Sequence, residues 1–471
     1  MADSRSAAEL EIGEKQWPLN AKITYFLFCI ISSIALTFYI ADGSYSDSQK
    51  YVLFIFFLSI GLWVTEAIPP FAVGILIIGY LVYTQGSGYL NSDPESVDRY
   101  LNSWVSPVIW LMLGGFFLAE GLTKTGLDRS LLNLAIKRKF TKPAYLLLAV
   151  MFVTAFGSMI MSNTATTAMM IAGIMPLIKI LDSTSGFKKA LLIAIPSSAS
   201  IGGMATIIGS PPNAIAVGAL SQAYNINIDF IDWMIFGVPI SFCLILIFWA
   251  VLKKRFLQGI EFPDLSLVSK NIVCIESNKI PKRVVLATTI ITLFMWMTTP
   301  LHNIPSAVIS GLPIIFLTVG GVLNSKDVRN LPWDTLMLVA GGLSLGVALS
   351  HTGLVEIFVN SVSSNLNGID FILIALLAGF ITIALSNVMS NTAAATILIP
   401  IGAALMPQDP KLAVLTIGLA ASAALFFPVS TPPNAIAFST GVLKASDFRL
   451  GGVVLGLIAP IVIVILLVLF L

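Results

Sequence analysis

Charged residues are scarce in this chain. Of its 471 residues only 11% are Asp, Glu, Lys or Arg, whereas 57% are hydrophobic and the mean hydropathy is +0.93. A soluble globular protein carries about 25% charged residues. The shortage excludes that class and predicts an all-α polytopic membrane protein. The net charge of +2 gives no reason to expect a nucleic-acid partner.

Cysteine and histidine are also rare. The three cysteines, Cys29, Cys243 and Cys274, are scattered and odd in number, and the chain has two histidines. This pattern indicates neither a disulfide framework nor a metal cluster. The first 20 residues are polar and mixed in charge, so no cleavable signal peptide is expected.

Most of the sequence consists of long apolar stretches. About 20 apolar residues cross a bilayer as a helix. By this rule we expect eleven spans, near residues 22–40, 51–68, 71–88, 106–126, 187–220, 231–252, 285–300, 305–323, 333–353, 411–441 and 450–471. Two further stretches, 144–180 and 370–407, are too long for one crossing. We interpret them as re-entrant helical hairpins, which enter and leave the membrane by the same face.

The basic residues support this count. Cytoplasmic loops collect Lys and Arg. With an internal amino terminus, eleven spans and two hairpins, every basic cluster lies on one side, while 221–230 and 354–369, which lack Lys and Arg, lie on the other. The carboxyl terminus is then outside, and we expect an integral protein of the plasma (inner) membrane.

Two motifs occur twice. Ser162-Asn163-Thr164-Ala165 recurs at 390–393, in the middle of the second hairpin, and Pro-Pro-Asn-Ala-Ile-Ala occurs at 211–216 and again at 432–437. The span starting at 51 enters from outside and its counterpart starting at 285 enters from inside. The sequence therefore predicts an inverted-topology repeat, a common plan among transporters.

These motifs predict four helix starts in mid-membrane. Ser and Asn are strong helix caps, so Thr164 and Thr392 are expected to begin the returning half-helices. Proline prefers a first helical turn, so the broken spans should restart with Ser210 and Thr431 as caps. Each helix start carries roughly half a positive charge and free N–H donors, which together suit an anion. The half-helices that end before each tip expose carbonyl oxygens, which suit Na⁺.

The same region has almost no side chain that could balance an anion. No charged residue lies in 190–228, 371–408 or 412–443, and 143–186 holds only Lys179 and Asp182. Burying a dianion without compensation is very costly. We therefore expect bound Na⁺ to supply the remaining positive charge, which would couple the two fluxes. The lack of a general base, nucleophile pair or metal cluster argues against an enzyme.

The chain resembles the divalent anion:sodium symporter family, which carries dicarboxylates, citrate or sulfate. The resemblance covers nearly the whole chain after about residue 20 and rests on both Ser-Asn-Thr tips and three further motifs. These are Thr65-Glu66-Ala67-Ile68-Pro69, Ile208-Gly209-Ser210-Pro211-Pro212-Asn213 and Ser430-Thr431-Pro432-Pro433-Asn434.

The resemblance implies a homodimer of elevator transporters in the lipid bilayer. It divides the chain into a cytoplasmic segment (1–21), scaffold parts (22–135 and 285–360), transport parts (136–255 and 361–471) and a linker (256–284). One Na⁺ would be held by Ser158, Ser162, Asn163 and the Gly209 backbone. The other would be held by Ser386, Ser390, Asn391 and the backbones of Met389 and Ser430. The family often has Thr where this chain has Ser386. The substrate would contact Ser162, Asn163, Thr164, Ser210, Ser390, Asn391, Thr392, Thr431 and Pro432.

Several of these residues also have a structural interpretation. The Ser-Asn-Thr tips could only cap buried helices. Asn213 and Asn434 are expected to bond backbone groups freed at the breaks, and Gly114-Gly115 and Gly341-Gly342 to allow close helix packing. Glu66, Glu120, Lys124 and Asp334 are expected near the membrane interface.

The leading hypothesis is sodium-coupled symport of a C4-dicarboxylate such as succinate, with Na⁺ as coupling ion and no other cofactor. A sodium-independent dicarboxylate exchanger or a sulfate carrier are alternatives within transport. An ion channel would also use re-entrant hairpins, but channels usually place one filter motif on a symmetry axis. Backbone and hydroxyl groups recognise a carboxylate without reporting the carbon number of the substrate, so the preferred dianion stays open.

Overall fold

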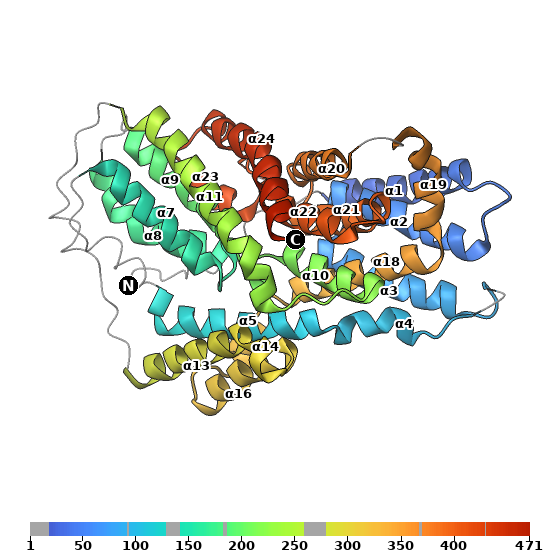
Figure 1. The fold of residues 1–471 in the computed structure, drawn as a ribbon, viewed down its shortest axis with the longest axis horizontal. Coiled ribbons are helices and arrows are strands. Elements are labelled where there is room, and N and C mark those ends of the chain that lie inside the picture. The colour runs from blue at the N-terminus through green and yellow to red at the C-terminus, as the bar shows by residue number, and fades with distance from the viewer. Residues whose placement is uncertain are drawn as a thin grey trace.

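The computed structural model of the chain describes residues 18–91, 94–128, 142–181, 186–258, 279–366, 370–428 and 430–471. Within these ranges every regular element is a helix, as the composition predicts (Figure 1). The basic cluster at 137–139 and most of the linker 256–284 lie outside the described residues.

Among the described residues, seven helices are long and apolar enough to cross a membrane. They are α1 (Leu19–Ile40), α2 (Asp47–Thr65), α4 (Asp98–Leu101) continued by the 3-10 turn η2 (Asn102–Val105) into α5 (Pro107–Thr125), α11 (Phe230–Phe256), α13 (Lys279–Met297), α18 (Trp333–His351) and α24 (Ala445–Phe470). Each coincides with one of the predicted spans. An integral membrane protein follows from these helices.

Four predicted spans are shorter or interrupted. The short ones are α3 (Pro70–Gly86) and the pair α15 (Ser306–Ile309) and α16 (Gly311–Val319). The interrupted ones are α9 (Gly186–Gly203) and α10 (Pro211–Tyr224), separated by the 3-10 turn η3 (Ile207–Gly209), and α22 (Pro410–Ala421) and α23 (Pro432–Ser439). The total of eleven crossings therefore stays a prediction.

Both predicted hairpins are pairs of helices joined by a short turn. The first consists of α7 (Pro143–Ser158) and α8 (Asn163–Ile180), and the second of α20 (Phe371–Ser386) and α21 (Asn391–Leu405). The returning helices begin at Asn163 and Asn391. The predicted starts at Thr164 and Thr392 are one residue late, because the preceding serine alone is the cap and the asparagine already has helical backbone.

One longer helix was not predicted. Helix α19 (Leu354–Leu366) follows α18 and leads to the second hairpin. Its 13 residues include the charged Glu356, so a search for long apolar runs passes over it. The short helices α14 (Thr299–His302) and α17 (Ser325–Arg329) complete the set.

The order of elements repeats along the chain. After α5 come a hairpin, a broken helix and the long α11, and after α18 and α19 come a hairpin, a broken helix and the long α24. Figure 1 shows α7, α8, α9 and α11 side by side at one end, and α1, α2, α3 and α19 at the other, with α22 between them. Helices α13 to α16 lie along α5.

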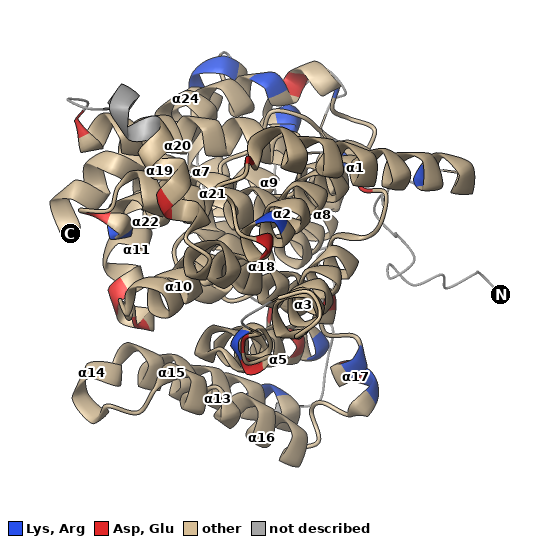
Figure 2. Cartoon of the chain, turned by 90° about the vertical axis from the view of Figure 1, so that its right-hand side faces the viewer, with Lys and Arg blue, Asp and Glu red and all other residues tan. Residues whose placement is uncertain are grey.

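Charge is confined to few segments of mostly uncharged helices (Figure 2). Lys189 Nζ lies 3.2 Å from Asp447 Oδ2, which joins α9 to α24. Lys124 pairs with Asp327 and so joins α5 to α17. In these two ion pairs, four charged side chains near helix ends neutralise each other, and none of the four lies at a hairpin tip.

The glycine pairs lie at close helix contacts, as predicted. A Cβ on Gly341 of α18 would lie 2.3 Å from Gly74 Cα of α3, and a Cβ on Gly114 of α5 would lie 2.9 Å from Ser310 Cα. Both distances are shorter than any real Cβ contact, so the backbones approach only because these residues have no side chain.

Replacing Gly341 by alanine should therefore destabilise the fold. The new methyl group meets backbone that cannot move away, and overpacking of this kind costs about 1–3 kcal/mol. Gly346→Ala on the same helix is the matched control, since its Cβ would lie 3.7 Å from Pro400 Cγ. We expect the melting temperature of the detergent-solubilised protein to fall for Gly341→Ala and to hold for Gly346→Ala. Equal melting temperatures for the two variants would contradict this packing.

Candidate functional site

The two hairpin tips have the same backbone geometry. Ser162 caps α8 with φ −63° and ψ 145°, and Ser390 caps α21 with φ −63° and ψ 146°. Each serine hydroxyl accepts a hydrogen bond of 3.2 Å, from the N–H of Ala165 or of Ala393. Serine satisfies only one of the free donors at each helix start, so the others remain available for a ligand.

The two broken helices also restart alike. Ser210 precedes Pro211 with φ −150° and ψ 135°, and Thr431 precedes Pro432 with φ −141° and ψ 149°. Both occupy the predicted cap position. Their side chains differ, because Thr431 accepts from the N–H of Asn434 whereas the Ser210 hydroxyl lies 2.8 Å from that of Ser422. That second contact joins the first broken helix to the second.

Asn213 and Asn434 bond to the backbone at the breaks, as predicted. Asn213 Nδ2 donates to the carbonyls of Gly203 and Thr206, at 2.8 Å each. Asn434 Nδ2 donates to the carbonyl of Phe427 at 3.0 Å. The last carbonyls of a helix have no partner within that helix. At the ends of α9 and α22 the N–H groups of Met204, Ala205, Ser422 and Ala423 bond to some of them, and the two buried amides bond to further carbonyls at the breaks.

Each hairpin tip is bonded to the break beside it. The Thr206 hydroxyl donates to the carbonyl of Met159 in the first tip. In the second half the N–H of Phe426 donates to Asn387 Oδ1 at 2.9 Å. These bonds hold a helix start of the hairpin next to a helix start of the broken helix.

All four helix starts line one cavity of about 430 Å³. Eleven of the fourteen residues predicted to bind substrate or Na⁺ line it: Ser162, Asn163, Thr164, Gly209, Ser210, Ser390, Asn391, Thr392, Ser430, Thr431 and Pro432. Three others named from the sequence, Ser158, Ser386 and Met389, do not line it and are buried. The structure thus brings the two halves of the repeat together at one place.

Oxygen atoms cluster under the first tip. One terminal atom of the Asn163 side-chain amide, which can be its nitrogen or its oxygen, lies close to three oxygen atoms. It is 2.6 Å from Ser158 Oγ, 3.0 Å from the carbonyl oxygen of Ala199 and 3.3 Å from that of Gly209. The amide can donate to these oxygens, or its own oxygen can join them around a cation. A set of neutral oxygen atoms of this kind is the ligand type that a hard cation prefers.

The second tip has unpaired oxygens instead. Ser386 Oγ and Asn391 Oδ1 are both buried and have no hydrogen-bond partner among the described residues. Ser430 Oγ donates to the carbonyls of Ala424 and Phe427. Buried polar atoms are normally paired, so these two oxygens are available to bind a ligand at this tip.

The cavity wall contains no Lys, Arg or His among its described residues, and its one charged residue is Asp334. Asp334 is exposed near the start of α18. The sequence predicts this residue near the membrane interface, and the start of α18 that carries it also forms part of the cavity wall. Its carboxylate repels an anion, so positive potential must come from other sources.

Sequence reasoning missed one side of the cavity. This side consists of the start of α3, the middle of α5 and the start of α18. Its residues are Pro69, Pro70, Phe71, Met112, Phe116, Pro332, Asp334, Thr335 and Leu338. The Thr65–Pro69 motif was the available signal, since it leads directly into α3.

A second cavity, of about 410 Å³, lies on the other side of η3. It is lined by the start of α5, the end of α10, the segment before α11 and the region from α14 to α15. Burial, with Asp232 nearby, raises the pKa of the Asp229 carboxyl in its wall. Ile207 lines this cavity and Ile208 lines the first.

Comparison with known proteins gives a consistent result. Residues 60–418 match the citrate transporter family CitMHS. A protein named sodium-dependent dicarboxylate transporter SdcS, from Staphylococcus saprophyticus, is 30% identical over 453 residues, covering 89% of this chain and 85% of the relative. An uncharacterized transporter of Haemophilus influenzae is 34% identical over 429 residues, covering 85% and 87%.

Two solved structures share the fold at low identity. The Alcanivorax borkumensis YdaH transporter has a TM-score of 0.55 at 12% identity and covers 84% of this chain and 97% of its own. Neisseria gonorrhoeae MtrF has a TM-score of 0.54 at 12% identity and covers 96% and 95%. At this identity the likeness concerns the fold alone.

Asn213→Ala should destabilise the first break. The change removes the amide donor from the carbonyls of Gly203 and Thr206, and only Thr206 keeps another, the N–H of Gly209. A buried group left unsatisfied costs about 1–3 kcal/mol. We expect a clear drop in the melting temperature of the purified protein, whereas Ser221→Ala, which removes an exposed hydroxyl on the same helix, should have little effect. An unchanged melting temperature for Asn213→Ala would show that these hydrogen bonds do not support the break.

Proposed function

Because the chain belongs to the divalent anion:sodium symporter family of membrane transporters, we propose that it carries a small dianion together with Na⁺. The proposed substrate is a C4-dicarboxylate such as succinate. The observation that supports this most directly is the cavity in which four helix starts meet without any cationic side chain among its described wall residues.

The helix starts favour an anion but compensate it only in part. Each contributes roughly half a positive charge within its first turn. Four of them would offset a dianion only if all pointed at it, and they enter from two hairpins and two broken helices. Asp334 adds a negative charge to the same wall. Bound cations are therefore proposed to complete the balance.

The two oxygen clusters are the proposed Na⁺ sites. The first comprises Ser158, Ser162, Asn163 and the Gly209 carbonyl, to which the Ala199 carbonyl can be added. The second comprises Ser386, Ser390, Asn391 and the backbones of Met389 and Ser430. Its support is the pair of buried oxygens without partners. Because these ligands are neutral, they would hold Na⁺ without fixing an extra negative charge near the dianion.

The substrate is proposed to bind between the tips. Its two carboxylates would accept hydrogen bonds from the starts of α8 and α21 and from Asn163, Thr164, Asn391 and Thr392. Ser210, Thr431 and Pro432 lie in the same wall. The two tips have nearly identical cap angles, so a symmetric dicarboxylate suits the pair.

The predicted topology gives the cavity a direction. The starts of α3 and α18, which form its wall, are both on the predicted cytoplasmic side, and the second cavity lies by segments predicted to be outside. We propose that both hairpins are re-entrant and that the cavity is open inward here. The transport parts of a homodimer would then move as an elevator, so that the site opens toward the second cavity instead.

Replacement of Na⁺ by choline tests the coupling. In proteoliposomes containing the purified protein, uptake of labelled succinate should fall by roughly tenfold or more, since a coupling free energy of 1–3 kcal/mol changes affinity by 5–150-fold. Unlabelled succinate inside the vesicles should stimulate labelled uptake, as expected of a carrier. Unchanged uptake in choline would favour the sodium-independent exchanger, and non-saturable uptake without counter-flow would favour a channel.

Asn163→Ala and Asn391→Ala test the site. Each change removes an amide from one proposed Na⁺ site and from the substrate wall, so we expect both variants to lose succinate uptake. Asn330→Ala, at an exposed position after α17, is the matched control and should transport normally. Without ligand, the melting temperature of Asn391→Ala should stay close to that of the original protein because Asn391 Oδ1 has no partner among the described residues, whereas Asn163→Ala also loses its contact with Ser158. Near-normal uptake by either tip variant would contradict the assignment.

A further inference from the structure

A third cavity, of about 330 Å³, lies away from the proposed substrate site. Its wall is apolar apart from two hydroxyl groups, and none of its residues is charged. The lining residues are Ile40, Tyr45, Leu53, Phe56, Phe57, Leu349, Leu354, Val355, Ile357, Phe358, Ser361, Pro400, Ile401 and Ala404. An uncharged cavity of this size is unsuited to the dianion or to Na⁺.

The cavity lies where three parts of the chain meet. One wall is α1 and α2, another is α19, and the third is the end of α21 in the second hairpin. Helix α19 connects α18 to that hairpin. Leu354, Phe358 and Ser361 lie three and four residues apart along it, which places them on one face.

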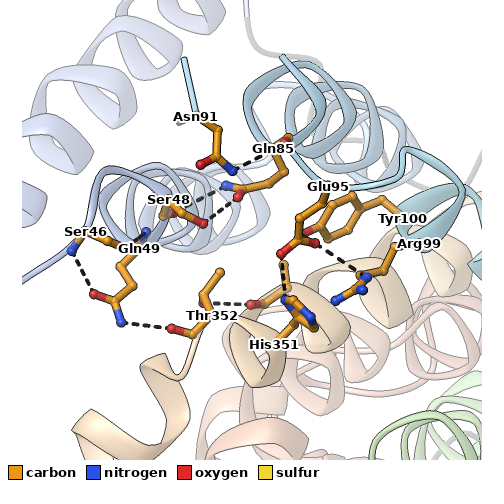
Figure 3. A network of polar contacts seen from close by, with 11 residues as sticks. Ser46, Ser48, Gln49, Gln85, Asn91, Glu95, Arg99, Tyr100, His351 and Thr352 are labelled. Carbon is orange, nitrogen blue, oxygen red and sulfur yellow. Dashed lines mark hydrogen bonds and ion pairs between the residues drawn. The ribbon is translucent and has the colours of Figure 1, made fainter. Parts of the chain in front are cut away.

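The end of α18, directly before α19, is bonded to the first half of the chain (Figure 3). Gln49 Nε2 of α2 donates to the carbonyl of Thr352 at 2.8 Å. His351 Nδ1 lies 2.8 Å from Glu95 Oε1, and the Tyr100 hydroxyl donates to Glu95 Oε2 at 3.0 Å. These contacts fix the end of α18, from which α19 continues, against α2 and the segment 95–100.

The cavity borders surface that faces outward from the protein. Ile40 is 41% exposed and Phe358 is 44% exposed, although both line the cavity. Its lining comes from the end of α1, the first part of α2 and the end of α21. The predicted topology places these segments in the outer half of the bilayer. At that depth the available solvent is lipid hydrocarbon, not water.

We propose that this cavity binds one acyl chain of an outer-leaflet lipid. The apolar wall matches the chain, and Tyr45 and Ser361 offer hydroxyl groups to the polar end of the lipid. This lipid site is separate from the proposed transport activity. It depends only on the predicted membrane topology of the chain. A chain bound here contacts α1 and α2, α19 and α21 together. It therefore stabilises the present position of the second hairpin against the first helices.

Photolabelling tests this site directly. The full-length protein is reconstituted with a phospholipid that carries a diazirine near the end of one acyl chain, extracted into detergent, irradiated and mapped by peptide mass spectrometry. We expect adducts on the segment containing Ile401 and Ala404 to survive extraction. Adducts on lipid-facing α24 positions such as Ile461 should be lost on washing.

Two filling variants make the test specific. Ala404→Trp and Leu53→Trp place an indole in the cavity from opposite walls and should each lower the retained adducts several-fold. Leu377→Trp, on exposed surface of the same hairpin, should leave them unchanged. Adducts that wash out as fast as those on α24, or that persist in both filling variants, would overturn the proposal. A cross-link between two copies of the chain at Ile401 would also overturn it. Labelling needs no transport, so its failure is separable from failure of the proposed symport.

Discussion

The rest of the structure depends on one constraint, which is electrostatic. Free energy is needed to place a doubly negative solute in a cavity that has no fixed positive side chain. The described wall of the main cavity offers helix starts, hydroxyls and amides, and its one charged residue is the carboxylate of Asp334. The partial positive charges of the helix starts lower that free-energy cost. We propose that cations bound in the oxygen clusters beside Asn163 and Asn391 supply the rest of the positive charge. We propose that such a site binds the anion weakly when the cations are absent, and that this dependence couples the two fluxes.

The fold serves this constraint by bringing helix starts into the protein interior. Four helices begin there. The side chains of Ser162, Ser390 and Thr431 cap three of them, and Ser210 precedes the fourth without a capping hydrogen bond. The same breaks leave carbonyls without partners, and Asn213 and Asn434 bond to several of them. The hydrogen bond between Ser210 and Ser422 then joins the two halves at the cavity. Interior backbone of this sort is tolerated in a membrane protein only where it is paired or lines a cavity.

Local features of the sequence were sufficient to predict the helix breaks and caps. Pro211 and Pro432 restrict the backbone before them, and Ser162 and Ser390 cap whatever follows, so the repeated motifs identified all four helix starts. The far wall of the cavity could not be predicted in this way, because Phe71, Met112 and Asp334 reach it only through the packing of α3, α5 and α18. Helix α19 was missed because it is short and carries a charge. The start of each returning helix was misplaced by one residue, since asparagine can be either a cap or the first helical residue.

The central claim is most directly tested by measuring the affinity of the purified protein for succinate by calorimetry over a range of Na⁺ concentrations. Linkage requires that each ligand raise the affinity for the other by the same factor. The account predicts that succinate binding tightens as Na⁺ rises and that Na⁺ binding tightens equally when succinate is present. A succinate affinity that is the same in Na⁺ and in choline would contradict it.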